Sequence, residues 1–355
     1  MMSSSKKVLF FLKKRQDIDS SPMINRRFCT APLMDWSDRH CRQFWRTISP
    51  NAHLYTEMVT SGAILHGDKE RHLRFDPAEH TVALQLGGSD PKELAQCARI
   101  GQTFGYDEIN LNVGCPSDRV QNGMIGAILM RHAPLVKDCI SAMQDACDID
   151  VTVKHRIGVD DMEDYSGLRD FVGTVAKSGC KTFIIHARKA WLKGLSPKEN
   201  RDIPPLDYPL VYRIKREFPE LEIIINGGIT TIDDCTEHLA HVDGVMLGRE
   251  AYQNPMILVA AEQYLFGNEH YQPSRRDILE RFLPYVETQL EQGVALHHIT
   301  RHILGLYHAV PGGKMFRRTL SQRAHLASSD ASLITEAMTT AEIAATSPRA
   351  KSAQF

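Results

Sequence analysis

The chain alternates between short apolar segments and longer stretches in which apolar residues recur at helical spacing. The short segments have four to six residues, contain many β-branched side chains and end in polar or glycine positions. They predict eight strands, at residues 28–32, 54–57, 82–86, 108–112, 151–156, 183–187, 223–227 and 244–248. The intervals carry helix-start signals. Asp90-Pro91-Lys92-Glu93 predicts a capping box with proline at the first helical position, and Thr230-Thr231 before two aspartates predicts another start.

The residues at the ends of these strands favour one of two folds. Eight strand–helix alternations fit either a closed barrel or a doubly wound open sheet. The strand ends carry Pro32-Leu33-Met34, Glu57, Gln85, Asn112, Lys154, His186, Asn226-Gly227-Gly228 and Gly248-Arg249. In a barrel, such residues converge on one mouth, where barrel active sites lie. We therefore expect an α/β fold, a (β/α)8 TIM barrel followed by a smaller C-terminal helical domain.

The 355 residues divide into four expected parts. Residues 1–22 read as a disordered extension, because their apolar run, Val8 to Leu12, is too short for a signal peptide or a membrane span. The expected barrel covers residues 23–265, the helical domain residues 266–335, and a tail residues 336–355. No membrane span is predicted, and we expect a cytoplasmic protein.

Composition and charge narrow the choice of partners. With 43% hydrophobic and 24% charged residues and a formal net charge of -1, the chain has the composition of an ordinary globular protein without a global positive field. A nucleic-acid partner would therefore need a local basic patch. The eight cysteines form no CxxC pair and no zinc-type cluster, which predicts reduced thiols and no metal site.

Two local basic stretches stand out. Between Arg301 and Arg323 there is no acidic residue, and the sequence "HILGLYHAVPGGKMFRRTL" predicts a helix, a Pro-Gly-Gly turn and a second helix. The basic residues of this stretch are Arg301, Lys314, Arg317, Arg318 and Arg323. A long loop after the sixth strand, residues 188–206, carries Lys189, Lys193, Lys198 and Arg201. Each stretch could contact phosphates or be a solvated basic surface.

Several strand-end residues are candidates for chemistry. Glycine turns after the seventh and eighth strands predict a phosphate site to which Arg249 could contribute. Lys154 could form a Schiff base, or place a positive charge beside an electron-rich cofactor. Gln85 and Asn112 could form hydrogen bonds with the edge of a heterocycle, or they could cap turns. His186 could be a base, a phosphate contact or a core histidine, so it does not by itself indicate a function. Cys115 lies between Gly114 and Pro116, just after a predicted strand. We therefore expect its thiol to be accessible to a ligand instead of buried.

Six segments together carry a resemblance to a known family. They are "APLMDWSDRHCRQFWR", "LYTEMVTSGAILHG", "VALQLGGSDP", "NLNVGCPSDRVQNGMIGAILM", "VTVKHRIGVDD" and "IIINGGI". From about Asn25 to Ala327 the chain resembles tRNA-dihydrouridine synthases, the A subfamily above all. The resemblance implies an FMN-dependent barrel with a helical domain. Such enzymes reduce the C5=C6 bond of D-loop uridines of tRNA, at position 20 and its neighbour 20a, with NADPH as reductant.

The resemblance also implies roles for individual residues. Cys115 would be the general acid that protonates C5, since a thiol is mostly protonated at neutral pH. Asn112 would hold the uracil edge. FMN would contact Pro32, Leu33, Met34, Gln85, Lys154, His186, Asn226, Gly227, Gly228, Gly248 and Arg249. Further tRNA contacts would come from Lys198, Arg201, Lys314 and Arg317, with Arg318 a weaker candidate. We expect a monomer without a stable protein partner.

Three other functions stay open at this point. One is an FMN-dependent barrel reductase of a small unsaturated substrate, against which the basic stretch 301–323 weighs. A second is a Schiff-base aldolase that uses Lys154. The third is a non-catalytic RNA-binding protein, against which Cys115 and a complete set of cofactor residues weigh.

Overall fold

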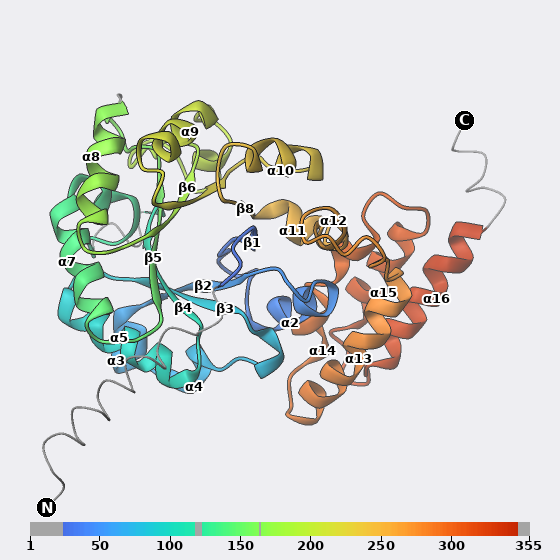
Figure 1. The fold of residues 1–355 in the computed structure, drawn as a ribbon. Helices are drawn as coiled ribbons and strands as arrows, with labels where there is room; N and C mark the ends of the chain where they lie inside the picture. The colour runs from blue at the N-terminus through green and yellow to red at the C-terminus, as the bar shows by residue number, and fades with distance from the viewer. Residues whose placement is uncertain (1–23, 118–122, 163–164, 347–355) are drawn as a thin grey trace, which may run out of the picture.

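The computed structural model describes residues 24–117, 123–162 and 165–346. The expected extension over residues 1–22 lies outside these ranges, as do residues 347–355. The described part consists of a barrel and, beside it, a group of helices from the C-terminal part of the chain (Figure 1). None of the helices in these ranges is long and apolar enough to cross a membrane.

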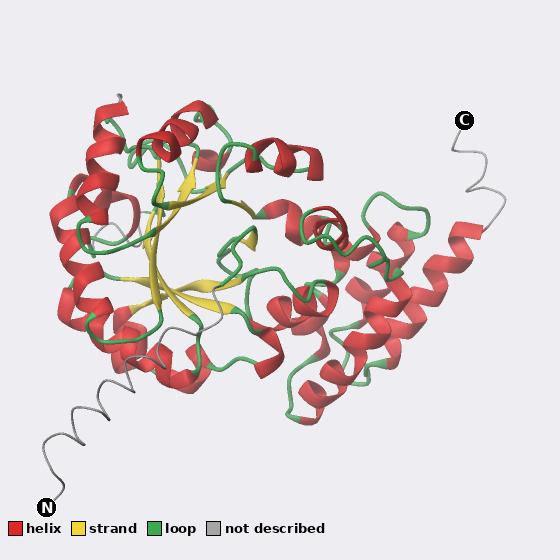
Figure 2. Cartoon of the chain, in the orientation of Figure 1, coloured by secondary structure: helices red, strands yellow, loops and turns green. Residues whose placement is uncertain are grey.

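Eight parallel strands form the barrel, which confirms the predicted fold and all eight predicted strands (Figure 2). Their hydrogen-bonded order is β1-β8-β7-β6-β5-β4-β3-β2. The ring closes where His53 bridges β1: Thr30 N–H donates to the His53 carbonyl at 2.9 Å, and His53 N–H donates to Phe28 at 3.0 Å. The strands are β1 (Phe28–Thr30), β2 (Leu54–Thr60), β3 (Val82–Gly87), β4 (Glu108–Val113), β5 (Asp150–Arg156), β6 (Thr182–His186), β7 (Glu222–Asn226) and β8 (Gly244–Leu247).

Helices surround the strands and bury their apolar faces against them. They are α2 (Arg39–Ile48), α3 (Ser61–His66), α4 (Lys69–Leu73), α5 (Pro91–Phe104), α7 (Ala133–Gln144), α8 (Tyr165–Ala176), α9 (Tyr208–Glu217), α10 (Ile232–Leu239), α11 (Arg249–Gln253) and α12 (Ile257–Tyr264). The helix start predicted at Thr230-Thr231 is confirmed in α10, where Thr231 and Asp234 form a capping box. The box predicted for α5 is only half formed. Asp90 caps the helix, but the Glu93 carboxylate accepts the hydroxyl of Ser61 at 2.7 Å instead.

The C-terminal helices are α13 (Arg275–Glu291), α14 (Leu296–Thr300), α15 (Gly313–Arg323) and α16 (Ser332–Thr346). The helix predicted before the Pro-Gly-Gly turn is wrong: only a single 3₁₀ turn forms there, Leu304–Tyr307. Gly305 lies so close to the end of α11 that a Cβ would sit 2.5 Å from the Tyr252 carbonyl oxygen. The second predicted helix forms as α15. The expected domain boundary after residue 335 falls inside α16.

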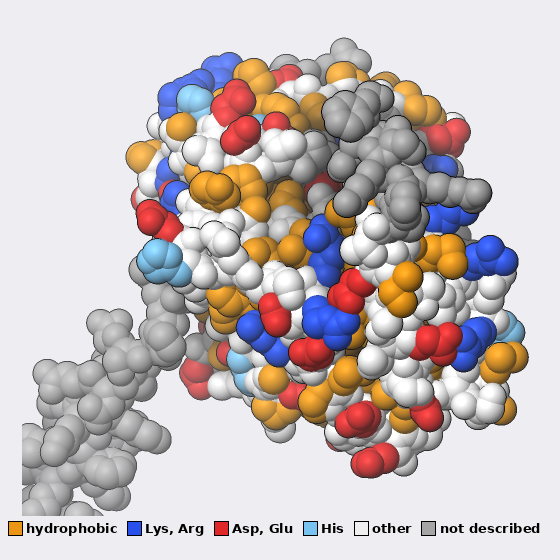
Figure 3. Space-filling model, turned by 90° about the vertical axis from the view of Figure 1, so that its right-hand side faces the viewer, with side chains coloured by type: hydrophobic (Ala, Val, Ile, Leu, Met, Phe, Trp, Pro, Cys, Tyr) orange, Lys and Arg blue, Asp and Glu red, His pale blue; other side chains and the backbone are white. Residues whose placement is uncertain are grey.

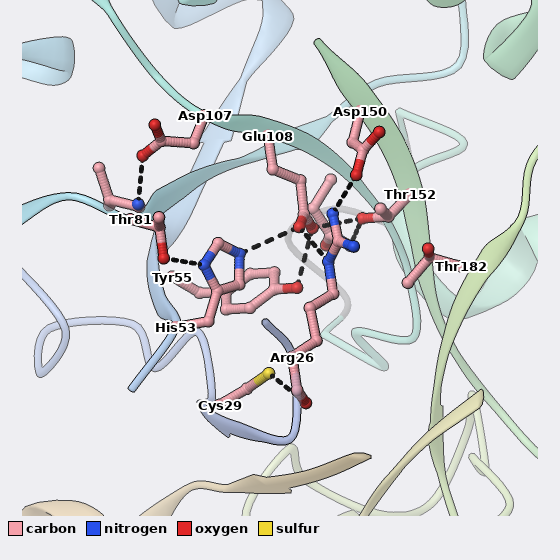
Figure 4. A network of polar contacts seen from close by, with 12 residues as sticks. Arg26, Cys29, His53, Tyr55, Thr81, Asp107, Glu108, Asp150, Thr152 and Thr182 are labelled. Atoms are coloured by element: carbon pink, nitrogen blue, oxygen red, sulfur yellow. Dashed lines mark hydrogen bonds and ion pairs between the residues drawn. The ribbon is translucent and has the colours of Figure 1, made fainter. Parts of the chain in front are cut away.

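A buried ionic network fills the floor of the barrel, at the amino ends of the strands (Figure 4). The carboxylate of Glu108 accepts from Arg26 Nε at 2.7 Å, Tyr55 at 2.8 Å and Thr152 at 2.5 Å, and it contacts His53 Nε2 at 3.0 Å. Burial alone would raise the pKa of Glu108, but the charge of Arg26 and these hydrogen bonds outweigh it. The pKa therefore lies well below its usual range, and the floor holds a fixed negative charge.

Candidate active site

A cavity of about 570 Å³ opens at the carboxyl ends of the strands. All eleven residues expected to bind the cofactor line it, together with Asn112, Cys115 and Arg201. The convergence of strand ends on one mouth is thus confirmed in geometry. Glu57 is an exception, since it lines a separate, smaller cavity. The pairing of β2 with β3 shifts register between Tyr55 and Met58, and Met58 faces the larger cavity in its place.

Cys115 is partly exposed in this cavity, whereas the other seven cysteines are buried. The side-chain oxygen of Asn112 accepts the backbone N–H groups of Gly114 at 3.1 Å and of Cys115 at 2.9 Å. The carbonyl of Cys115 accepts the N–H of Ala127 at 2.8 Å, and Gly126 approaches so closely that a Cβ would lie 2.3 Å from that carbonyl oxygen. The turn that presents the thiol is therefore fixed from both sides. Residues 118–122 of the same motif lie outside the described ranges.

A chain of hydrogen bonds leads from the barrel floor to this turn. Thr152 donates to Glu108 and accepts an amide hydrogen of Asn110 at 2.7 Å. Asn110 accepts from Gln85 Nε2 at 2.8 Å, and Gln85 accepts from Asn112 Nδ2 at 2.8 Å. An ionised carboxylate can only accept, so each member must donate toward Glu108. The charge on the floor therefore fixes which way the amides of Gln85 and Asn112 face.

Lys154 extends from β5 into the cavity, where its Nζ donates to the Asn226 side-chain oxygen at 3.1 Å. Burial, and secondarily the positive charge of Arg156, lower its pKa to about 7. Asn226 is held in turn, because its amide donates to the Met246 carbonyl at 2.7 Å. Burial, and secondarily the positive charge of Arg156, also keep the pKa of His186 well below its usual range, so its imidazole is neutral. An anion bound close to Lys154 would raise the pKa of that lysine, so the lysine would then be fully protonated.

The glycine turn after β7 has the shape of a phosphate cradle. Gly227 and Gly228 have φ angles of +115° and +72°. A Cβ on Gly227 would lie 2.6 Å from the His186 ring, and one on Gly228 would lie 2.5 Å from Leu206 and 2.8 Å from the Tyr208 hydroxyl. These positions require glycine both for backbone conformation and for space.

Donors for an anion are available at this turn and at the next. Within the described ranges, no protein group accepts the backbone N–H groups of Gly227, Gly228 and Gly248. Arg249 lines the cavity and forms an exposed ion pair with Asp202 at 2.8 Å. Free N–H groups, a nearby guanidinium and glycines without side chains fit the phosphate of a cofactor such as FMN.

Arg156 belongs to the cavity although the sequence reasoning missed it. Its guanidinium donates to the carbonyls of Gly114, Lys189 and Asn200, each at 2.9 Å, and so ties the Cys115 turn to the long loop 188–206. Burial lowers its pKa to about 10. Lys154 and Arg156 are two residues apart on β5, and strand alternation places both toward the same side. That alternation was the available signal.

The remaining candidates for tRNA contact lie outside the cavity. Lys198 is exposed on the loop whose Pro197 and Arg201 form part of the rim. Lys314, Arg317 and Arg318 are exposed on α15. Figure 3 shows the end of the molecule that the C-terminal helices form, where Lys and Arg side chains stand among Asp and Glu side chains instead of covering the face. On this face, basic side chains therefore alternate with acidic ones.

Comparison with known proteins agrees with this geometry. A sequence model described as "Dihydrouridine synthase (Dus)" matches residues 29–342. The chain is 56% identical over 323 residues to the tRNA-dihydrouridine(20/20a) synthase of Salmonella typhi, which covers 91% of this chain and 97% of the relative. It is 57% identical over 313 residues to that of Escherichia coli strain K12, covering 88% and 90% of the two chains. For Pseudomonas aeruginosa the identity is 58% over 304 residues, covering 86% and 92%. The chain belongs to the dihydrouridine synthase family.

Proposed function

We propose that this protein is a tRNA-dihydrouridine(20/20a) synthase, with FMN as cofactor and NADPH as reductant. It reduces the C5=C6 bond of uridines 20 and 20a in the D-loop of tRNA. The observation that carries the proposal is the partly exposed Cys115 on the same cavity as Lys154, His186 and the glycine cradle. The family and the names of its relatives support the same reaction.

The cofactor assignment follows the lining of the cavity. The backbone of Gly227, Gly228 and Gly248, with Arg249 and His186, would hold the phosphate end. Lys154 and Gln85 would contact the ring system, and Asn226 orients Lys154. The Pro32–Met34 turn would contact the ring as well. When bound, the reduced flavin supplies the hydride that adds to C6 of the uracil.

Cys115 completes the reduction by donating its thiol proton to C5. The S–H bond breaks, a C5–H bond forms, and a thiolate remains that regains its proton from solvent. Lys154 and Arg156 line the same cavity as Cys115. Asn112 sets the position of the sulfur through the backbone of the turn and has a second amide hydrogen for the uracil edge.

The target uridine must leave its folded loop to enter the cavity, which costs a few kcal/mol. Contacts of Lys198, Arg201, Lys314 and Arg317 with the tRNA backbone offset that cost away from the reacting bond. Free uridine lacks these contacts and is therefore a poor substrate.

Anaerobic oxidation of NADPH by the purified flavoprotein tests the proposal. We expect oxidation to depend on unmodified tRNA and to be far slower with free uridine at any accessible concentration. Comparable rates with free uridine or another small unsaturated compound would favour a small-molecule reductase instead. A borohydride-trapped adduct on Lys154 would favour an aldolase.

A further inference from the structure

A second cavity, of about 360 Å³, lies beside β2 and the start of α2. Its walls come from the start of α2 with Asp38 and Arg39, from β2 with Glu57, from α4 and its end with Arg71 and Arg74, and from the residues at the end of α14. The loop after β1 and strand β2 separate the two cavities. Leu33, Met34 and Trp36 line the active site, while Asp38 lines the second cavity.

The second cavity has an excess of positive charge. Arg71 and Arg74 are exposed, and neither forms an ion pair with any residue of the described ranges. Arg39 donates to the neutral amide of Gln289 at 3.4 Å. The carboxylate of Asp38 does not compensate these arginines, because it contacts His302 at 3.0 Å and Arg301 at 3.3 Å and caps α2. Three guanidinium groups are therefore available to an anion from outside.

Glu57 adds a hydrogen-bond acceptor to this basic cavity. One of its carboxylate oxygens accepts the backbone N–H of Asp35. A simple anion would be repelled by Glu57, whereas a nucleotide offers both a phosphate for the arginines and hydroxyl or N–H donors for a carboxylate.

We propose that the second cavity binds a nucleotide of the tRNA next to the target uridine, with its phosphate on Arg39, Arg71 and Arg74. This inference rests on the proposed function. The position supports it, since the two cavities share walls: the loop after β1 lines both, and β2 contributes Met58 to the active site and Glu57 to the second cavity. In addition, α14 packs against both α2 and α15, so the subsite adjoins the helix that carries Lys314 and Arg317.

The double variant Arg71→Gln/Arg74→Gln tests the subsite, with Arg99→Gln/Arg216→Gln as the matched control. The control removes two exposed arginines from α5 and α9 on the outside of the barrel. For the first variant we expect the KM for tRNA to rise roughly tenfold at similar kcat. The slope of log affinity against log salt should become shallower by about one. The KM for NADPH and the flavin content should stay as in the wild type, and the control should keep all five values.

Three results would overturn the subsite. They are an unchanged tRNA KM and salt slope, an equal effect in the control, and a rise in the KM for NADPH in place of that for tRNA, which would mark a dinucleotide site. Failure of the proposed function is distinguishable, because it would appear as a wild-type protein that reduces no tRNA. In that case direct tRNA binding at varied salt still tests the arginines, with the same predicted loss and the same control.

Discussion

The side-chain oxygen of Asn112 accepts the backbone N–H of Cys115 at 2.9 Å. Asn112 can offer that oxygen only because its amide nitrogen donates to Gln85, which in turn donates to Asn110. The orientation of this chain is set by Glu108, at the floor of the barrel, through Thr152. The position of the proposed acid thus depends on a carboxylate that never contacts the substrate.

Thr152→Val tests this dependence, because valine keeps the shape of threonine and removes the hydroxyl that links Glu108 to Asn110. We expect kcat for tRNA reduction to fall at least about tenfold, as hydrogen bonds to charged groups contribute about 1.5–3 kcal/mol. Thr152→Ser retains the hydroxyl and should restore most of the activity. Thr182→Val is the control, since Thr182 donates to Glu222 at 2.7 Å outside the chain. Equal losses of activity in Thr152→Val and Thr182→Val would show a general effect on the barrel floor.

The exposure of Cys115 predicts selective alkylation. Iodoacetamide should modify the native protein once, at Cys115, because the other seven cysteines are buried. Peptide mass mapping locates the label, and Cys115→Ala should remain unlabelled while it still binds FMN. A first label on a buried cysteine would contradict the accessibility described for this turn.

The lowered pKa of Lys154 predicts proton uptake when FMN binds. At pH 8 a lysine with a pKa of about 7 is mostly neutral in the flavin-free protein. The anionic cofactor raises that pKa, so binding should take up close to one proton, and Lys154→Met should abolish the uptake. Calorimetry in buffers of different ionisation enthalpy measures it. The unfolded lysine stays protonated to about pH 10.4, so the same group makes the flavin-free protein more stable as pH rises from 7 toward that value.

The glycine cradle predicts a specific loss of cofactor. Gly227→Ala places a Cβ 2.6 Å from the His186 ring at a φ of +115°, and should weaken FMN binding strongly. Gly194→Ala is the control, because Gly194 has a φ of +84° with nothing within 4 Å of its added Cβ. That variant should lose only about 1 kcal/mol of stability through backbone strain. Flavin fluorescence titration measures FMN affinity, and thermal unfolding measures the loss of stability. Equal FMN affinity in both variants would show that the glycine turn after β7 does not bind FMN.

Much of the site could be predicted because parallel strands bring their carboxyl ends together, so the strand-end residues include every residue expected to bind the cofactor. Glu57 was also expected at the active site, but the register shift in β2 places Met58 there in its stead. Strand alternation places Arg156 beside Lys154, but its role, binding carbonyl groups of two distant loops, is visible only in the structure. The hydrogen-bond chain from Glu108 was also not predictable, since it depends on side chains from three strands meeting inside the barrel.

The central claim is best tested by mass analysis of the D-loop of tRNA from cells that lack this protein, before and after incubation with the purified protein, FMN and NADPH. The account predicts a gain of two hydrogens at uridine 20 or 20a with the wild-type protein, and almost none with Cys115→Ala carrying the same amount of flavin. A full gain with Cys115→Ala would remove the cysteine from the mechanism. No gain with a flavin-loaded wild type would contradict the proposed substrate.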